Sequence, residues 1–179
     1  MTTPLYESLL GTAWTGLAPV VRRLHGGEGR AHGRFRVRRG GVIARAIAAL
    51  LRMPAAGEGV AVTLAVGGEP ETERWTRSFA GQPLCTLQWR QGPLLVEALG
   101  LFLCHFRLRE DGGALVFEQV GAALGGRGFA IPLPRFLSPK IEGRATAERD
   151  GAHVDIEIRA PLVGLVIAYD GIVVPEETP

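Results

Sequence analysis

The stretch that decides the fold is LLVEALGLFLCHFRLREDGGALVFEQV, residues 94–120. It contains three apolar-rich runs of strand length, at 94–99, 101–109 and 114–120. Asp111-Gly112-Gly113 separates the last two runs, and a glycine-containing turn of this kind is a strong signal for a β-hairpin. Because connections this short can join only antiparallel neighbours, the stretch predicts an antiparallel meander.

The same pattern covers most of the chain after residue 60. Alternating runs between turn residues predict further strands at 60–66, 73–79, 84–89, 141–149, 153–159 and 162–174. A flat sheet of so many strands would expose long edges, and curling removes them. The sequence therefore predicts a mainly β domain of the α+β class, an antiparallel meander curled into a barrel or half-barrel. The glycine- and proline-rich residues 121–139 are predicted to form a loop or lid.

Helices and one further strand precede the meander. Residues 1–28 predict short amphipathic helices, and 29–54 predict a strand followed by an apolar helix at about 42–53. We expect this helix to pack on the curved sheet or plug its mouth, with four apolar side chains facing inward: Ile43, Ile47, Leu50 and Leu51. The whole chain, 1–179, is predicted to be one domain, with the meander at 60–174 and a flexible tail at 175–179.

Composition and charge exclude several functions. No apolar run reaches the roughly 18 residues needed to span a bilayer, and no signal peptide is recognisable, so we expect no membrane span and a cytoplasmic protein. The strand at 30–38 carries a charged outer face, formed by Arg30, His32, Arg34, Arg36 and Arg38. Its one aromatic residue, Phe35, faces the other way, which argues against nucleic-acid binding. The alanine-rich helix at 42–53 lacks the bulky anchors and flanking cations of a membrane-surface helix, so burial is the favoured interpretation.

The reactive side chains do not form a recognisable catalytic or metal site. Cys104 and His105 are adjacent in a strand and therefore project to opposite faces, so they cannot act as a nucleophile and its base. The four histidines show no zinc-binding spacing. The sequence predicts no catalytic residue, no metal and no cofactor.

One charged side chain is predicted to lie inside the sheet. In ERWTRSF, residues 73–79, two aromatics share a face with Arg77, and a buried guanidinium needs a partner. The partner is either a carboxylate of the same sheet, Glu97 or Glu118, or the anionic group of a ligand. In the second case the ligand tail would lie among apolar residues. The predicted ligand-binding residues are Trp75, Arg77, Phe79, Trp89, Phe106 and Phe117.

Several short motifs occur in an order that resembles a known family. They are LYESLLG (5–11), GRFRVRRG (33–40), ERWTRSFAG (73–81), FRLREDGGALVFE (106–118), IPLPRFLSP (131–139) and APLVGLVIAYDG (160–171). Together they resemble the bacterial domain of unknown function 4166. In some relatives such a domain looks like a C-terminal partner of a saccharopine-dehydrogenase-like domain that binds a nucleotide. This chain has no GxGxxG motif after a strand, so the resemblance carries over no dehydrogenase activity.

Two functions follow as hypotheses, and an enzyme is a third and less favoured one. The first is a non-enzymatic binding domain for an apolar or lipid-like small molecule with an anionic group. The second is an accessory module that docks on a separately encoded saccharopine-dehydrogenase-like oxidoreductase through the arginine face of 30–38. An enzyme would need titratable groups to converge in a cleft, for example Arg77, His105 and Glu118.

Overall fold

The computed structural model describes residues 3–69 and 71–176. Over these residues the chain forms eleven strands, which belong to one antiparallel sheet. The strands are β1 Gly29–Arg39, β2 Gly57–Glu69, β3 Thr72–Phe79, β4 Gln82–Gln91, β5 Leu94–Leu99, β6 Phe102–Asp111, β7 Ala114–Gly126, β8 Phe129–Pro132, β9 Lys140–Glu148, β10 Gly151–Ala160 and β11 Gly164–Pro175. The helices are α1 Leu5–Leu10, α2 Pro19–Leu24 and α3 Val42–Leu50, with a 3₁₀ helix at Gly11–Gly16.

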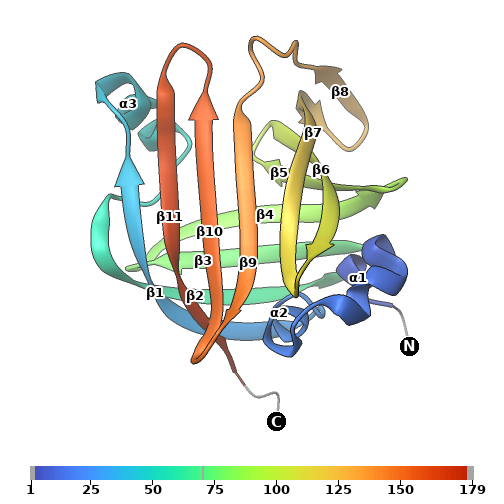
Figure 1. The fold of residues 1–179 in the computed structure, drawn as a ribbon. Helices are drawn as coiled ribbons and strands as arrows, with labels where there is room; N and C mark the ends of the chain where they lie inside the picture. Colours follow the sequence, from blue (N-terminus) through green and yellow to red (C-terminus); the bar gives the residue numbers. More distant parts are fainter. Residues whose placement is uncertain (1–2, 70, 177–179) are drawn as a thin grey trace.

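The sheet closes into a barrel (Figure 1). Sequential strands pair from β1 to β7, β7 pairs with β9, and β11 returns to pair with β1. Ten strands therefore form the ring, while β8 pairs only with the end of β7 and lies outside it. The prediction of a curled antiparallel meander is confirmed, and the barrel is closed rather than a half-barrel.

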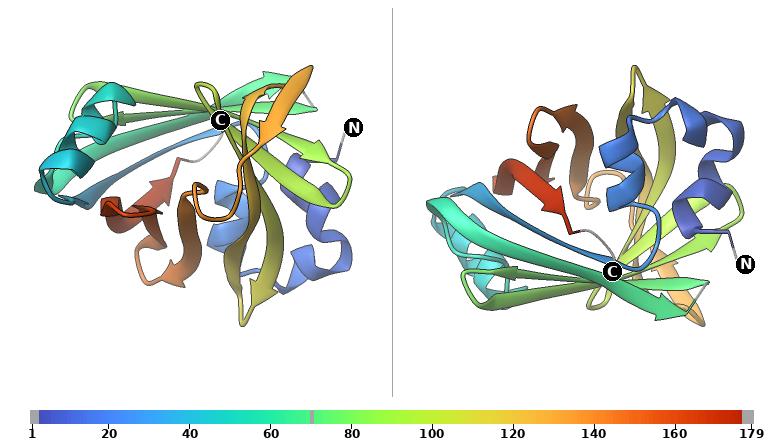
Figure 2. Two further views of the ribbon diagram at one scale, coloured as in Figure 1. Left: turned by 90° about the horizontal axis from the view of Figure 1, so that it is seen from above. Right: turned by 90° about the horizontal axis from the view of Figure 1, so that it is seen from below.

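Helices lie at both ends of the barrel. The first two, α1 and α2, lie together at one end, while α3 lies at the opposite end beside the β10–β11 connection (Figures 1 and 2). In an up-and-down barrel successive connections alternate between the ends, so β1–α3–β2, β3–β4, β5–β6, β7–β8–β9 and β10–β11 all turn at the α3 end. None of the helices in the described residues is both long and apolar enough to cross a membrane.

The predicted orientation of the apolar helix is wrong in part. In α3 the buried residues are Ala44 and Ala48, whereas Ile43 is 66% exposed and Leu50 is 82% exposed. The connection to the helix approaches β11 closely: a Cβ atom at Gly40 would lie 1.8 Å from the carbonyl oxygen of Leu165, so only glycine fits there. The small alanines then pack on the sheet. Ile47 and Leu51 are half-buried against the core, as expected, whereas Ile43 and Leu50 are exposed.

We expected a loop or lid at 121–139, but part of this segment forms strands. Strand β7 continues to Gly126 and forms a hairpin with β8. Prolines forbid a helix here, but they are compatible with a short edge strand, which needs only one row of ladder hydrogen bonds. At Gly125, where φ is +143°, a Cβ atom would lie 2.2 Å from the Phe129 carbonyl oxygen, so glycine permits the tight return.

Part of the predicted C-terminal tail pairs with β1. The expected tail begins inside β11, because Pro175 is its last residue, and the Glu176 N–H donates to the carbonyl oxygen of Arg30 over 2.8 Å. Residues 177–179 lie outside the described part of the chain.

A glutamine side chain completes the seam where the barrel closes. Strands β7 and β9 pair only from Leu115 to Glu118, after which a bulge in β7 redirects it towards β8. The amide of Gln119 then bridges to β9: Nε2 donates to the Pro139 carbonyl oxygen over 2.8 Å, and the Ile141 N–H donates to Oε1 over 2.6 Å.

Replacing Gln119 with leucine is expected to lower the free energy of unfolding by about 1–3 kcal/mol, because the Ile141 N–H loses its partner in a half-buried position. Urea unfolding would measure the change. Gln91→Leu, at the exposed end of β4, is the matched control and should change stability by less than about 0.5 kcal/mol. Equal losses in the two variants would show that the bridge does not stabilise the seam.

Candidate functional site

The barrel encloses a cavity of about 480 Å³. Its wall consists mainly of the inward-facing apolar side chains of the strands. Tyr6 of α1 and Leu24 and His25 at the end of α2 close the floor. At the other end Ile47 of α3 and Leu137 of the β8–β9 connection border the mouth. The volume lies within the range of small-molecule pockets, about 300–1,000 Å³.

Four of the six predicted ligand-binding residues line this cavity: Trp75, Arg77, Phe106 and Phe117. Strand alternation was sufficient to place them, because their apolar neighbours at every second position share the concave face. Phe79 shares the inner face of β3 with them but does not line the cavity: its ring packs in the barrel interior at 5.4 Å from Tyr169 and 6.0 Å from Phe35, measured between ring centroids.

The placement of Trp89 among the cavity residues is wrong. In β4 the side chains of Leu84, Thr86 and Gln88 face the cavity, so Trp89 projects outward. It is buried on the outside of the barrel in a second cluster with Val96, Leu103 and Ala123. The guanidinium of Arg127 lies 5.4 Å from the centroid of its ring and covers it. Near the end of β4 the more apolar face, with Leu87 and Trp89, is the outer one, whereas the polar Thr86 and Gln88 face the cavity, so the sequence pattern indicated the wrong side.

Arg77 lies in the cavity wall together with the carboxylate of Glu97. Its Nη2 lies 3.6 Å from Oε1 of Glu97, and its Nη1 donates to Oγ1 of Thr86 over 3.0 Å. The guanidinium also lies 5.3 Å from the centroid of the Trp75 ring, a cation–π contact. Glu97 was one of the two carboxylates predicted as partner. The distance between Arg77 Nη2 and Glu97 Oε1 is longer than a hydrogen bond. N–H donors of the guanidinium therefore remain available to the cavity.

The surroundings keep Arg77 charged. Burial opposes the charge and lowers the pKa of Arg77, but the nearby Tyr169, Glu97 and Tyr6 outweigh it, so the pKa is raised. The side chains of Arg77 and Glu97 are 17% and 22% exposed, and that exposure is towards the cavity. A guanidinium with unsatisfied donors in an apolar chamber can bind a carboxylate, a phosphate or another oxygen-rich group.

The floor contains a polar network that sequence reasoning missed. The hydroxyl of Tyr6 donates to Oε1 of Gln88 over 2.7 Å, and burial raises the pKa of Tyr6 well above its ordinary value. Trp75 is held by its Nε1, which donates to Oε2 of Glu73 over 3.0 Å. His25 packs against Tyr6 and Trp75, with ring centroids at 4.8 and 5.4 Å. The only available signal was the alternation of Thr86 and Gln88 with apolar residues in β4.

The groups that could have supported catalysis do not converge. Burial raises the pKa of the Cys104 thiol to about 12, so it stays protonated, and His105 faces the outside of the barrel. Burial lowers the pKa of His25 to about 4, and its Nδ1 lies 3.0 Å from the Val21 carbonyl oxygen. The cavity therefore combines a neutral imidazole, a neutral thiol and one ion pair, which suits binding better than proton transfer.

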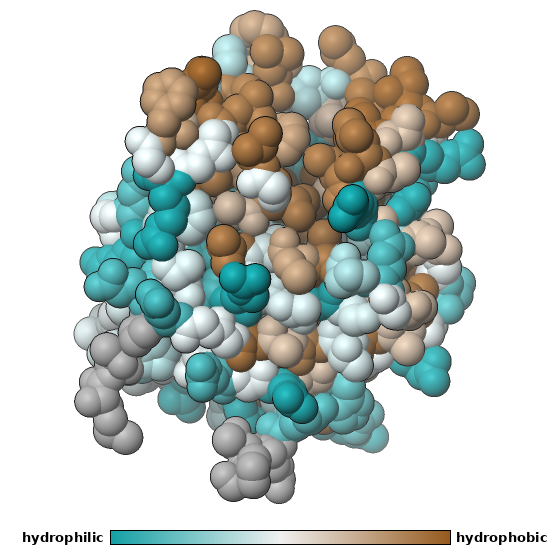
Figure 3. Space-filling view, turned by 180° about the vertical axis from the view of Figure 1, so that it is seen from behind, coloured by the Kyte–Doolittle hydropathy of each residue, from teal (hydrophilic) through white to brown (hydrophobic). Residues whose placement is uncertain are grey.

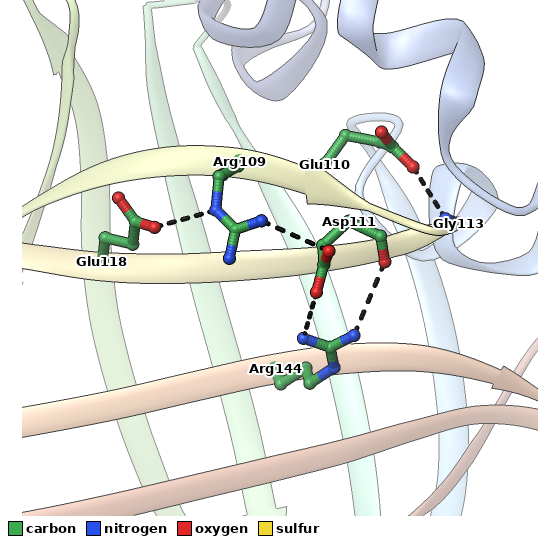
Figure 4. Close-up of polar contacts among 6 residues, drawn as sticks. All are labelled: Arg109, Glu110, Asp111, Gly113, Glu118 and Arg144. Atoms are coloured by element: carbon green, nitrogen blue, oxygen red, sulfur yellow. Dashed lines mark hydrogen bonds and ion pairs between the residues drawn. The ribbon is translucent and has the colours of Figure 1, made fainter.

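Glu118, the other predicted partner of Arg77, lies on the outer surface at the barrel seam (Figure 4). Its Oε1 accepts a hydrogen bond from Nε of Arg109 over 2.8 Å, and Nη1 of Arg109 lies 3.3 Å from Asp111. Arg144 of β9 donates to the same aspartate over 2.9 Å. These exposed pairs join β6, β7 and β9, and the hydrogen bond from Arg144 holds the pKa of Asp111 below its ordinary value.

The arginine face of β1 is also on the outside, and its middle is occupied by local partners. Arg36 donates through Nε to Oε2 of Glu58 over 2.8 Å, and Arg34 donates through Nη1 to the Gly59 carbonyl oxygen over 3.1 Å. His32 lies 3.5 Å from Glu176. Neighbouring strands therefore already use several of the donors that a partner protein would need.

Comparison with known proteins gives one match. The family model described as "Domain of unknown function (DUF4166)" matches residues 17–172. No curated protein and no solved structure matches the chain. The matched segment extends from the end of the 3₁₀ region through α2 and the barrel to β11. Because the model covers most of the sequence, the chain belongs to the family of the domain of unknown function 4166.

Proposed function

We propose that this barrel is a non-enzymatic binding domain for an apolar, lipid-like small molecule with an anionic group. The observation that carries the proposal is the apolar cavity of about 480 Å³ with the Arg77 guanidinium in its wall. The helices α1 and α2 close one end, so the ligand would enter at the α3 end. Its anionic group would reach Arg77, and its tail would extend along the apolar wall towards the mouth.

The polar contacts support this orientation. Thr86 and Glu97 use part of the hydrogen-bonding capacity of Arg77, and a ligand oxygen would use the donors that face the cavity. Tyr169 of β11 is buried in the cavity wall near enough to Arg77 to raise its pKa, and it offers a hydroxyl donor, since burial raises its own pKa. The protonated Cys104 adds no competing charge. Its free, buried thiol is compatible with a reducing, cytoplasmic compartment, which is part of the proposal.

A cavity-filling variant is expected to abolish ligand binding. Ile156 of β10 faces the cavity, so Ile156→Trp fills the space that the tail would occupy. We expect native mass spectrometry to show one long-chain fatty acid bound per wild-type protein, with at least a ten-fold loss of affinity in the variant. The matched control is Ile172→Trp, which makes the same change on the outer face of β11.

The probe series also tests the anionic group. A fatty acid should bind more tightly than the primary alcohol of equal chain length, because only the carboxylate pairs with Arg77. Equal binding of acid and alcohol would remove the anionic group from the proposal. Unchanged binding in Ile156→Trp would place the ligand outside the cavity and overturn the proposal as a whole.

The accessory-module alternative would use the outer face of β1. Its test is a pull-down from the native host that compares wild type with a variant in which Arg34, Arg36 and Arg38 are changed to glutamate. Unchanged partners would remove this alternative.

A further inference from the structure

The open end of the barrel is the most apolar exposed region of the molecule. Large apolar side chains from four separate connections point into solvent there (Figure 3). Exposed fractions run from 66% to 106% for Ile43 and Leu50 of α3, Leu101 of the β5–β6 turn, Phe129 of β8, Phe136 of the β8–β9 connection and Leu162 of the β10–β11 connection. We call these six residues the apolar rim. A contiguous exposed patch of this kind on a folded domain marks an interaction site.

The charged residues within the connections at this end are all arginines. The connections at 40–56, 80–81, 100–101, 127–139 and 161–163, all within the described part of the chain, contain four arginines and neither aspartate nor glutamate, a sum of +4. The arginines are Arg45, Arg52, Arg127 and Arg135, and all four are exposed. At the opposite end the described connections carry acidic residues, among them Glu28, Glu71 and Asp150. The molecule is therefore polarised along the barrel axis.

The chemistry of the open end identifies its partner. An apolar rim interspersed with arginines matches the interface of an anionic lipid bilayer, where apolar side chains enter the headgroup region and cations stay among the phosphates. A second copy of this chain would bring four arginines against four arginines, which opposes docking of two rims. We propose that the barrel docks on anionic membranes with its open end, so that the apolar rim enters the interface and the cavity mouth faces the lipid.

This inference revises the expectation for the helix at 42–53. Judged alone, the helix lacks bulky anchors, and the sequence favoured burial over membrane binding. The fold supplies the missing anchors from elsewhere, since Phe129 and Phe136 lie at the same end as Ile43 and Leu50. Hydrogen bonds to the segment that follows α3 hold the helix in place. Arg39 donates through Nε to the Pro54 carbonyl oxygen over 2.7 Å. Gln82 donates to the carbonyl oxygens of Arg52 and Met53 over 3.0 Å each.

Vesicle co-sedimentation of the full chain tests the proposal. We expect binding to vesicles of phosphatidylcholine mixed with phosphatidylglycerol at about three to one, much weaker binding to phosphatidylcholine alone, and weakening as salt rises. Arg45→Gln combined with Arg135→Gln should lower the partition coefficient about 30-fold, at about five-fold per arginine. Ile43→Ser combined with Phe136→Ser, two rim residues that do not line the cavity, should lower it by about ten-fold or more.

Matched controls separate the rim from general charge and hydrophobicity. Arg30→Gln combined with Arg149→Gln removes two exposed arginines at the closed end, and Val120→Ser combined with Val174→Ser removes two exposed valines outside the apolar rim. Both controls should bind as wild type does. The proposal is overturned if wild type does not bind anionic vesicles, or if the controls lose as much binding as the rim variants.

Sedimentation equilibrium distinguishes the competing occupant. A wild-type dimer that the Ile43→Ser, Phe136→Ser variant converts to monomer, without vesicle binding, would make the rim a dimer interface and would refute membrane docking. The inference goes beyond ligand binding and is separable from it. Ile156→Trp should still bind vesicles, whereas the rim variants should still retain a fatty acid in native mass spectrometry.

Discussion

Lowering the pH from 7 to 4 is expected to reduce the free energy of unfolding by about 3 kcal/mol through His25 alone. Burial lowers the pKa of His25 from 6.5 to about 4 in the folded protein, and Arg77 adds to this effect. Between these two values the unfolded chain binds the proton and the folded one does not. The stabilisation is therefore complete above pH 6.5 and is lost progressively as the pH falls towards 4.

The carboxyl groups of Glu73 and Asp111 also have shifted pKa values, and their effects on stability at low pH have opposite signs. Burial raises the pKa of Glu73, so its proton is held more tightly in the folded state and its effect favours folding at lower pH. The hydrogen bond from Arg144 lowers the pKa of Asp111, so that exposed carboxylate loses its contribution only below its ordinary pKa of 3.8. The contribution of His25 is isolated by comparison with a variant that lacks it.

Urea unfolding at pH 7 and pH 4 would measure the effect. His25→Gln should lose about 3 kcal/mol less than wild type over this interval, because its side chain does not titrate. His32→Gln, on the exposed outer face of β1, should keep the wild-type difference. If His25→Gln showed the full wild-type loss, the floor of the cavity would not be the acid-sensitive part of the fold.

Replacement of Arg77 by methionine is expected to lower the free energy of unfolding by about 3 kcal/mol. The substitution leaves Glu97 in the cavity wall without its cation, and removal of one partner from a buried pair costs about 3–5 kcal/mol. Both side chains keep some exposure to the cavity, which places the expected loss at the lower end of this range. Arg77→Met should also abolish the preference for a fatty acid over its alcohol.

A double-mutant cycle in urea provides the measurement. Arg77→Met combined with Glu97→Met should be more stable than Arg77→Met alone, because the uncompensated charge disappears together with its partner. Arg109→Met, which breaks the exposed pair with Glu118, is the control and should cost much less stability than Arg77→Met. Additive losses at positions 77 and 97 would show that the two charges do not stabilise each other.

The fold could be predicted from local features of the sequence, and so could part of the cavity. Alternation of period two in residues 73–79 and 101–109 placed Trp75, Arg77 and Phe106 on one face, and this face is the inner one. The glycine turn at Gly112-Gly113 set the β6–β7 hairpin, where both residues have positive φ. These signals act within one strand or one turn, so neighbouring residues are sufficient to reveal them.

Other parts of the site are set by contacts between strands and helices that are far apart in the sequence. Trp89 lies on the more apolar face of β4, which sequence reasoning takes as the inner one, and only its cover by Arg127 and its cluster with Val96 place that face outside. The short helices gave no sign that Tyr6 and His25 would form the cavity floor. In the same way, the hairpin at β8 appeared only when Ala123–Gly126 found its partner strand.

By itself the sequence determined the strands, their antiparallel order and the apolar character of one face, because each is set by residues a few positions apart. Only the tertiary structure decided that the barrel closes, that α1 and α2 seal one end, and that the arginines and large apolar residues of separate connections gather at the other. The physical reason is that closure and end-to-end polarity arise from contacts between residues far apart in the chain. Such contacts leave no period in the sequence, and they exist only once the sheet has curled.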